Sequence, residues 1–179
     1  MGKRLGMARM EALLENLKRE IALGAGTTLK GRRDATETLS TVGTYASPTK
    51  TLEATDSGMT FFVDMSTVNI VVQLPTPAAG LNFKIIMATA SDNEATKDFA
   101  LTTGSNSVDI GGHIRQGGNS VIEITSNTSV VAFDSNDGAV TVGDYLDIYC
   151  DGTDWYCIGT TVTAATIDIA DTYNGHSLP

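Results

Sequence analysis

Carboxylates are the side chains in this sequence with the most obvious capacity for chemistry, but their spacing is that of turns. A hydrolase needs one carboxyl group in an apolar pocket beside an ionised one, and no segment marks such a pair. An aspartate in a turn instead accepts a hydrogen bond from a backbone N–H downstream. Seven aspartates lie in segments of that kind: Asp56, Asp92, Asp98, Asp134, Asp137, Asp151 and Asp154. The sequence therefore predicts neither a glycosidase nor any other enzyme.

Three glycine-containing segments resemble parts of ligand-binding loops. Segment 134–138 alternates oxygen ligands as a calcium loop does, but the twelfth position holds Tyr145 where the glutamate belongs. The glycine pairs at 111–112 and 117–118 lack the Lys-Ser/Thr that completes a phosphate cradle. We expect tight turns at all three places. His113 and Arg115, between the glycine pairs, are expected in a solvated loop or against an anion or receptor.

The two cysteines flank the turn signal at 151–154. If Cys150 faces Trp155 across a hairpin, Cys157 faces Ile148, and the two sulfurs become diagonal neighbours. Diagonal positions lie too far apart for good disulfide geometry, so buried thiols are the preferred interpretation. Neither His113 nor the other histidine has metal-ligand spacing to this pair. The sequence thus predicts no metal site and no cofactor.

A basic arm precedes an acidic remainder, and the change falls near residue 33. Residues 1–33 hold eight Lys/Arg and three Glu, a charge of +5, which leaves −14 for residues 34–179 within the net charge of −9. Within the arm, the 4-3-4 spacing of Met10, Leu14, Leu17 and Ile21 predicts an amphipathic helix over 7–23. So short a helix is marginal alone in water, so it must pack on the body, on sister helices or on a partner.

Beyond a linker or strap at 34–50, short apolar runs alternate with turn signals. Strands are predicted at 51–54, 59–64, 69–74, 82–88, 99–103, 107–110, 120–125, 129–134, 145–150 and 155–163, with one more at 166–170 in the tail 164–179. Short strands with no helix between them are typical of a β-sandwich or barrel, in a jelly-roll-like arrangement over 51–163. The absence of a fixed-period repeat disfavours solenoids and propellers. The expected fold is therefore mainly β, preceded by one helix and an extended strap.

Several partner classes are disfavoured by composition. No run approaches the roughly 20 apolar residues that span a bilayer, and the start of the chain lacks the apolar core of a secretory signal. We therefore expect synthesis in the cytoplasm and no membrane partner. The basic patch at 30–33 is compatible with phosphate contact, but it contains no aromatic residue to stack on bases, and an acidic body repels a polyanion. Nucleic acid is thus disfavoured as a partner.

Three motifs stand out within residues 51–159: a strand that ends in the turn Leu74-Pro75-Thr76-Pro77, the Ala-Gly-Leu-x-Phe segment at 79–83, and a terminal Asp-Gly-x-x-Trp hairpin at 151–156. With these motifs, residues 51–159 resemble a β-rich domain that recurs in tailed-phage virion proteins. Such domains occur in capsid decoration or cement proteins, head fibres and tail spikes, usually as trimers. The resemblance implies no catalytic residues, and the helix of the basic arm lies outside the matched region.

The combined expectation is a homotrimeric decoration protein on the surface of a phage head, bound to the major capsid protein or another virion protein. Capsid docking is assigned to Met10, Leu14, Leu17, Ile21, Lys3, Arg4, Arg9, Lys30, Arg32 and Arg33. Surface recognition is assigned to Tyr145, Tyr149, Trp155, Tyr156, His113 and Arg115. The alternative is a tail or head-fibre adhesin that binds a host-surface glycan through the aromatic group. A third interpretation turns the basic arm inward, onto packaged DNA.

Overall fold

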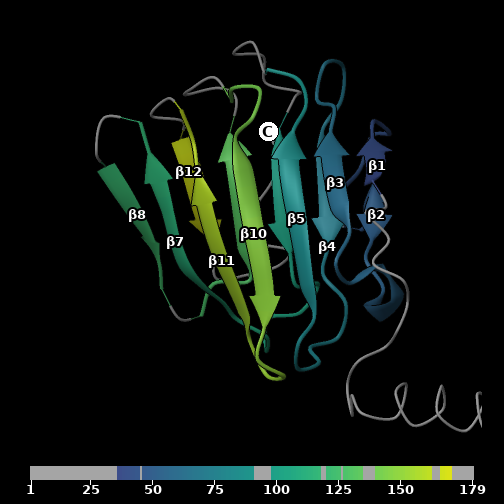
Figure 1. The fold of residues 1–179 in the computed structure, drawn as a ribbon, viewed down its shortest axis with the longest axis vertical. Coiled ribbons are helices and arrows are strands. Elements are labelled where there is room, and N and C mark those ends of the chain that lie inside the picture. Colours follow the sequence, from purple (N-terminus) through teal and green to yellow (C-terminus); the bar gives the residue numbers. More distant parts are fainter. Residues whose placement is uncertain are drawn as a thin grey trace, which may run out of the picture. The chain divides into compact units, whose positions relative to one another are not determined.

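The structure is a computed structural model that describes residues 36–44, 46–90, 98–117, 120–125, 127–134, 140–162 and 166–170. All of these belong to one compact unit, Asp34–Pro179. The basic arm at 1–33, with its predicted helix, lies outside the described residues. Within them the chain forms twelve strands and one short 3-10 helix, η1 (Ala54–Asp56). The prediction of a mainly β fold is therefore confirmed (Figure 1).

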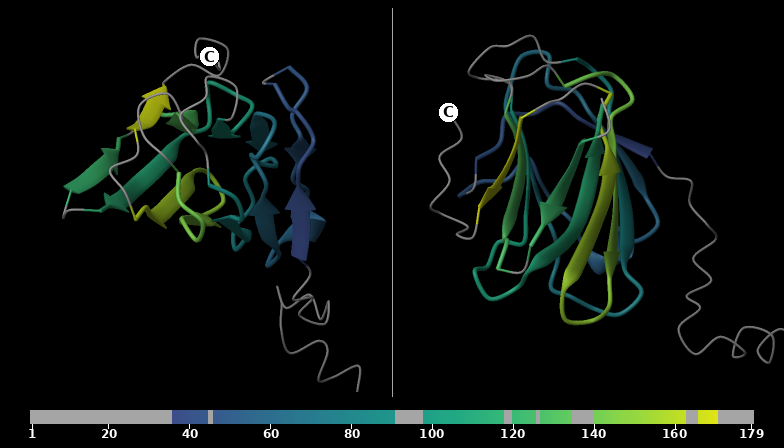
Figure 2. Two further views of the ribbon diagram at one scale, coloured as in Figure 1. Left: turned by 90° about the horizontal axis from the view of Figure 1, so that it is seen from above. Right: turned by 90° about the vertical axis from the view of Figure 1, so that its left-hand side faces the viewer.

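The described strands form two sheets that face each other (Figure 2). Sheet A has the order β1 (Thr36–Leu39), β3 (Thr60–Val63), β5 (Asn82–Met87), β10 (Tyr145–Cys150), β11 (Trp155–Thr160), β7 (Ile110–Gln116) and β8 (Ser120–Ile124). Sheet B has the order β12 (Thr166–Ala170), β9 (Val130–Asp134), β6 (Phe99–Thr102), β4 (Ile70–Gln73) and β2 (Lys50–Thr51).

The first six strands visit the two sheets alternately and pair in parallel within each. In sheet A, Thr36 pairs with Thr60 and Thr60 pairs with Lys84, a step of 24 residues each time. In sheet B the steps are unequal, because β2 pairs with β4 at a distance of 22 residues (50 to 72) and β4 with β6 at 29 (70 to 99). This winding resembles that of a short solenoid. Solenoids were disfavoured because the sequence shows no fixed-period repeat, and the unequal steps in sheet B explain why no such repeat is visible.

The later strands pair mainly antiparallel, so both sheets are mixed. The β10–β11 hairpin lies between β5 and β7, antiparallel to β5, while β11 and β7 run parallel. In sheet B, β9 pairs antiparallel with both β6 and β12. Because β1 to β6 pair in parallel, the fold differs from an all-antiparallel jelly roll. The predicted jelly-roll-like arrangement is therefore not confirmed.

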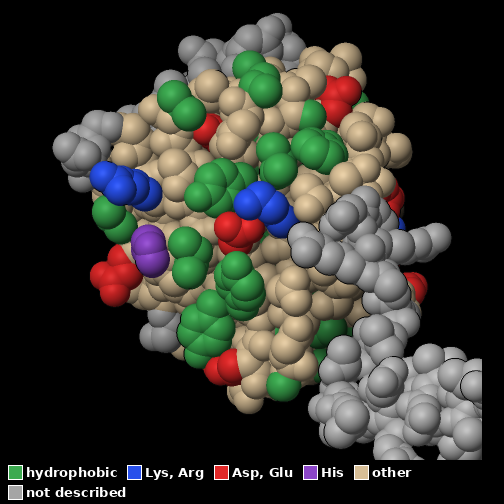
Figure 3. All heavy atoms as spheres, in the orientation of Figure 1, with side chains coloured by type: hydrophobic (Ala, Val, Ile, Leu, Met, Phe, Trp, Pro, Cys, Tyr) green, Lys and Arg blue, Asp and Glu red, His purple; other side chains and the backbone are tan. Residues whose placement is uncertain are grey.

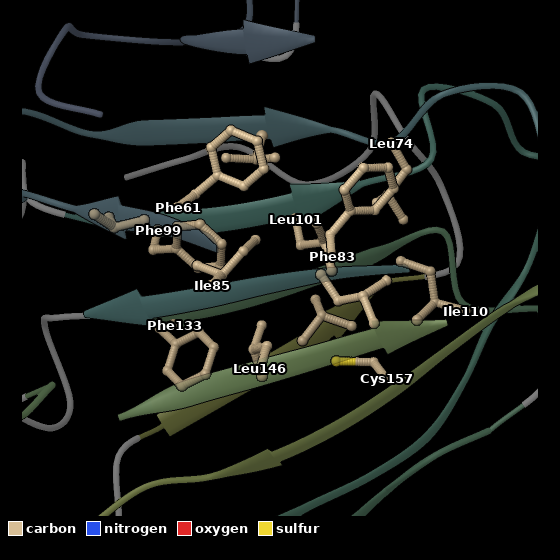
Figure 4. Packing of buried hydrophobic residues seen from close by; sticks show 14 of the residues in the cluster. Phe61, Leu74, Phe83, Ile85, Phe99, Leu101, Ile110, Phe133, Leu146 and Cys157 are labelled. Carbon is tan, nitrogen blue, oxygen red and sulfur yellow. The ribbon is translucent and has the colours of Figure 1, made fainter. Parts of the chain in front are cut away.

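Large apolar side chains fill the space between the sheets (Figure 4). The rings of Phe83 and Trp155 lie 5.8 Å apart between centroids, and those of Phe99 and Phe133 are also 5.8 Å apart. Sheet B is buried on its other face as well, where Val71, Ala100, Val130 and Ala132 form a second cluster with at most 1% exposure. Sheet A, in contrast, buries one face only.

The cysteines lie where the hairpin argument placed them. Cys150 pairs with Trp155 and Cys157 with Ile148, and both thiols are free and buried, as predicted. Burial raises the pKa of the Cys157 thiol to about 12. A thiol in that state is neutral and unreactive at neutral pH.

Two expected loops are in fact strands. The expected strap includes β1, whose Leu39 is buried in the core, and Lys50 of β2 bonds Glu37 of β1 at 2.8 Å. The glycines at 111–112 and His113 belong to β7, not to a turn or a solvated loop, and the predicted strand at 107–110 was wrong in position. Gly112 has φ +132°, and a Cβ there would collide with the carbonyl oxygen of Cys157. Glycine is therefore needed because β7 and β11 approach closely, not because the chain turns.

This close approach gives a first prediction. Replacing Gly112 by alanine should lower the free energy of unfolding by about 2–4 kcal/mol, because it combines a disfavoured φ with a backbone collision. Urea unfolding of the full chain measures this. Gly111→Ala is the matched control, since a Cβ there meets nothing closer than the Tyr156 ring at 4.0 Å, and it should change stability by less than about 1 kcal/mol. Equal effects of the two substitutions would contradict the explanation.

Candidate functional site

The candidate site is the outer face of sheet A, defined by the residues that strand alternation turns away from the core. On β10 these are Tyr145, Asp147 and Tyr149, between buried neighbours. Eighteen outward positions follow from the register of the sheet: Thr36, Thr38, Thr60, Phe62, Asn82, Lys84, Ile86, Tyr145, Asp147, Tyr149, Tyr156, Ile158, Thr160, Gly111, His113, Arg115, Val121 and Glu123. Figure 3 views the molecule from this side, and hydrophobic side chains gather over the central strands.

A tyrosine pair stands at one end of this face. Tyr149 and Tyr156 oppose each other across β10 and β11 and are 49% and 44% exposed. Ile158, the next outward residue of β11, is 45% exposed. Gly111 flanks Tyr156 on β7 without a side chain, which leaves that edge of the ring open. Exposed aromatic rings with polar tips are typical of binding surfaces.

Asp151 holds the Tyr156 ring in place from the adjoining turn. The Tyr156 hydroxyl donates to Asp151 Oδ2 at 3.0 Å, while Asp151 Oδ1 accepts from the N–H groups of Thr153 and Asp154 at 2.8 and 2.9 Å. These backbone bonds, from Asp154 and then Thr153, together with the bond from Tyr156, lower the pKa of Asp151. The same contact raises the pKa of Tyr156. The ring is therefore positioned before any partner arrives.

Charges on the outer face are few and balanced. Lys84 bonds Asp147 at 3.1 Å, and its ammonium lies 4.4 Å from the centre of the Tyr145 ring. Nearer the β8 edge, His113 lies opposite Glu123, and Arg115 lies opposite Val121. Two cations and two carboxylates give this face a formal charge of zero with neutral histidine.

Five of the six residues assigned to surface recognition share this face, and Trp155 is the correction. Its side chain is fully buried and packs on Phe83, because strand alternation sends Trp155 inward when Tyr156 points outward. Ile158 and Val121 also belong to this face but were not predicted as surface-recognition residues. Strand alternation predicts both residues on the outer face, once one buried residue of the same strand shows which positions face the core.

The buried carboxyl group of Asp144 has surroundings like those of a catalytic group, but its hydrogen bonds connect two backbone segments. Burial raises the pKa of Asp144, the kind of shift that marks functional sites. Its oxygens, however, accept backbone N–H bonds from Thr141 at 2.9 Å and from Val162 at 2.8 Å. Asp144 thus ties the start of β10 to the segment after β11.

A hollow of about 690 Å³ lies beside the carboxyl ends of β2, β4 and β6. It is lined by Thr51, Leu52, Glu53, Ala54, Gln73, Leu74, Pro75, Thr76, Pro77, Thr103, Gly104, Ser105 and Val108. Among the described residues of that lining, Glu53 is the single charged one. The described lining therefore presents no pair of charged groups for acid–base chemistry.

Other assigned positions lie beyond what the structure describes. All ten capsid-docking residues are in 1–33, and positions 135–139 of the calcium-like segment are likewise outside the described residues. Among the described side chains, no group of three or more His, Cys, Asp or Glu is placed to hold a metal ion. No helix within the described part is long and apolar enough to cross a membrane.

The chain was compared with protein-family models and with curated proteins. No protein-family model matches the chain, and no curated protein matches it.

The Asp151 contacts give a second prediction. Because the folded state lowers the pKa of this carboxyl, its stabilising contribution is present above the ordinary value of 3.8 and is lost as the pH falls through the folded-state value. The melting temperature of the native chain should therefore fall more steeply on acidification than that of Asp151→Asn. Tyr156→Phe, which removes one of the three bonds, should show an intermediate slope. Parallel curves for all three proteins would refute this role.

Proposed function

We propose that this chain is a non-enzymatic structural protein of a phage virion, a decoration protein that binds the head surface and stabilises the shell. The observation that carries the proposal is the outer face of sheet A, which exposes aromatic rings and has equal numbers of positive and negative side chains at its outward strand positions. Sheet B, by contrast, has a buried cluster on its outer face as well. Such a face suits recognition of a macromolecule. The resemblance of residues 51–159 to phage virion domains supports the same class.

In this proposal the basic arm attaches the protein to the shell. Its charge of +5 against −14 for the rest of the chain suits docking onto an acidic or apolar protein surface. Met10, Leu14, Leu17 and Ile21 would supply the apolar contacts. Each copy would bridge neighbouring capsid subunits and resist the internal pressure of packed DNA. Copies are expected to act as a homotrimer.

Co-sedimentation with empty phage heads tests the attachment. Reversing the basic patch, with Lys30→Glu, Arg32→Glu and Arg33→Glu in the full chain, should weaken binding to heads by roughly tenfold or more. The matched control keeps the charge, with Lys30→Arg, Arg32→Lys and Arg33→Lys, and should bind like the native chain. Unchanged head binding by the reversed variant would count against docking through the arm, and no binding by the native chain would remove the decoration proposal.

A second candidate, an adhesin for a host-surface glycan, is favoured by the tyrosine end of the face. A sugar ring stacks on exposed aromatic rings while carboxylate and amide groups accept or donate to its hydroxyls. Tyr149 and Tyr156 lie beside Asp151 and Asn82, which supply those groups. This arrangement is the one the adhesin interpretation requires.

Glycan-array binding separates the two candidates. An adhesin should bind a defined set of glycans, and Tyr149→Ala should abolish that binding while the arm variants leave it intact. Val42→Ala, an exposed apolar residue outside the outer face of sheet A, is the control. A native chain that sediments with heads and binds no glycan would leave the decoration proposal alone in place.

A further inference from the structure

We propose that the outer face of sheet A is covered by a second copy of this chain. This goes beyond the proposed function, because a face that packs on its own counterpart joins copies in twofold pairs, a contact separate from the expected homotrimer. The inference requires only that copies associate, and it can be tested without phage heads.

The first support is the apolar content of a face that would be polar in a monomer. An antiparallel or mixed sheet with one solvated side usually alternates apolar inward and polar outward. Here seven outward residues are apolar or aromatic: Phe62, Ile86, Tyr145, Tyr149, Tyr156, Ile158 and Val121. Phe62, Ile86 and Tyr145 oppose one another directly across β3, β5 and β10. The Phe62–Ile86–Tyr145 row lies on one side of the central Lys84–Asp147 pair, and the Tyr149–Tyr156 pair lies on the other, so apolar groups flank the pair on both sides (Figure 3).

Charge identifies the second copy as the partner that suits this face. Residues 34–179 carry −14, so two copies repel each other on average over their surfaces. The outward strand positions carry zero, since Lys84 and Arg115 balance Asp147 and Glu123, and the Asp151 carboxylate bonded to Tyr156 adds one negative charge at the tyrosine end. Two copies can thus meet here with much less like charge than the average of their surfaces. Lys84 and Asp147 already bond each other, which reduces the number of unpaired charges that covering the face would desolvate.

The dimensions of the face set the size of the contact. The described strands of sheet A span roughly 29 Å at about 4.8 Å per strand, and the first and third outward residues of a central strand lie about 13 Å apart. The flat area is on the order of 400 Å², about half of the roughly 800 Å² per partner of a standard interface, so the pairing should depend on protein concentration. Sheet-on-sheet packing is a common way to bury such a face.

Tyr145 and Tyr149 flank Asp147 along β10, and tyrosine is a residue type that often dominates binding energy. Charged side chains are usually depleted from the core of an interface, but Lys84 and Asp147 would enter it already bonded to each other. Tyr156 is already oriented by its bond to Asp151, so less conformational entropy is lost when a partner packs on it. Ile158 lies between the Tyr149–Tyr156 pair and the Tyr145 row and is the natural anchor.

Sedimentation equilibrium of the full chain tests this inference over a wide range of protein concentration. The native chain should form a dimer or larger closed oligomer. Ile158→Lys, at a position 45% exposed in one copy, should weaken association by at least roughly tenfold. The matched control is Val162→Lys, which adds the same charge at an apolar residue 64% exposed and outside this face, and it should associate like the native chain. Circular dichroism and thermal unfolding confirm that each variant is folded.

The alternative outcomes are distinguishable. A native chain that stays monomeric at every concentration overturns the inference, and so does association that Ile158→Lys leaves unchanged. Association lost in Leu14→Glu but kept in Ile158→Lys would assign the contact to the basic arm. Ile158→Lys that is monomeric yet still sediments with heads would support this inference while separating it from attachment to the shell. A monomer that binds glycans through Tyr149 would assign the face to a sugar.

Discussion

The register of the β10–β11 hairpin decides which residues of sheet A become core and which become surface. Trp155 and Cys157 enter the core only when Tyr156 and Ile158 face outward, and a slip by one residue would exchange the two sets. The register is held at its end by the Asp151 carboxylate, which accepts two N–H bonds of the turn. The Trp155 ring, packed on Phe83, holds it from the inside.

The two sheets have different roles because their outer faces differ. Sheet B is apolar on both sides, and the cluster around Val71 and Ala132 is buried within the chain itself. Sheet A has one apolar side in the core and one mixed side that remains accessible, with Tyr149 and Ile158 near half exposure. An assembly protein needs a rigid support and one surface to present. In the proposed assembly, the burial of sheet B would supply the support, and the outer face of sheet A would be that surface.

Electrostatics connects this surface to the proposed assembly. The unit formed by residues 34–179 is strongly acidic, yet two of its four Lys/Arg lie on the outer face of sheet A. Mutual repulsion favours separation of the acidic surfaces, while the balanced face permits approach. A basic arm on the same chain would meet an acidic partner instead. Two attachments of different chemistry, one to sister copies and one to a shell, are thereby compatible in one short protein.

Local patterns in the sequence were sufficient for most strands and for the cysteine environment. Strands β3 to β6 and β8 to β12 were each anticipated to within a few residues, and the pairing of Cys150 with Trp155 followed from loop length alone. Tertiary structure decided the rest. Gly112 of β7 was predicted to lie in a turn because its true requirement, the close approach of β11, comes from a strand more than 40 residues away. The parallel winding of β1 to β6 was hidden by unequal connections. Which side of β11 faces the core depended on packing, since Trp155 and Tyr156 are both aromatic and only the space between the sheets distinguishes them.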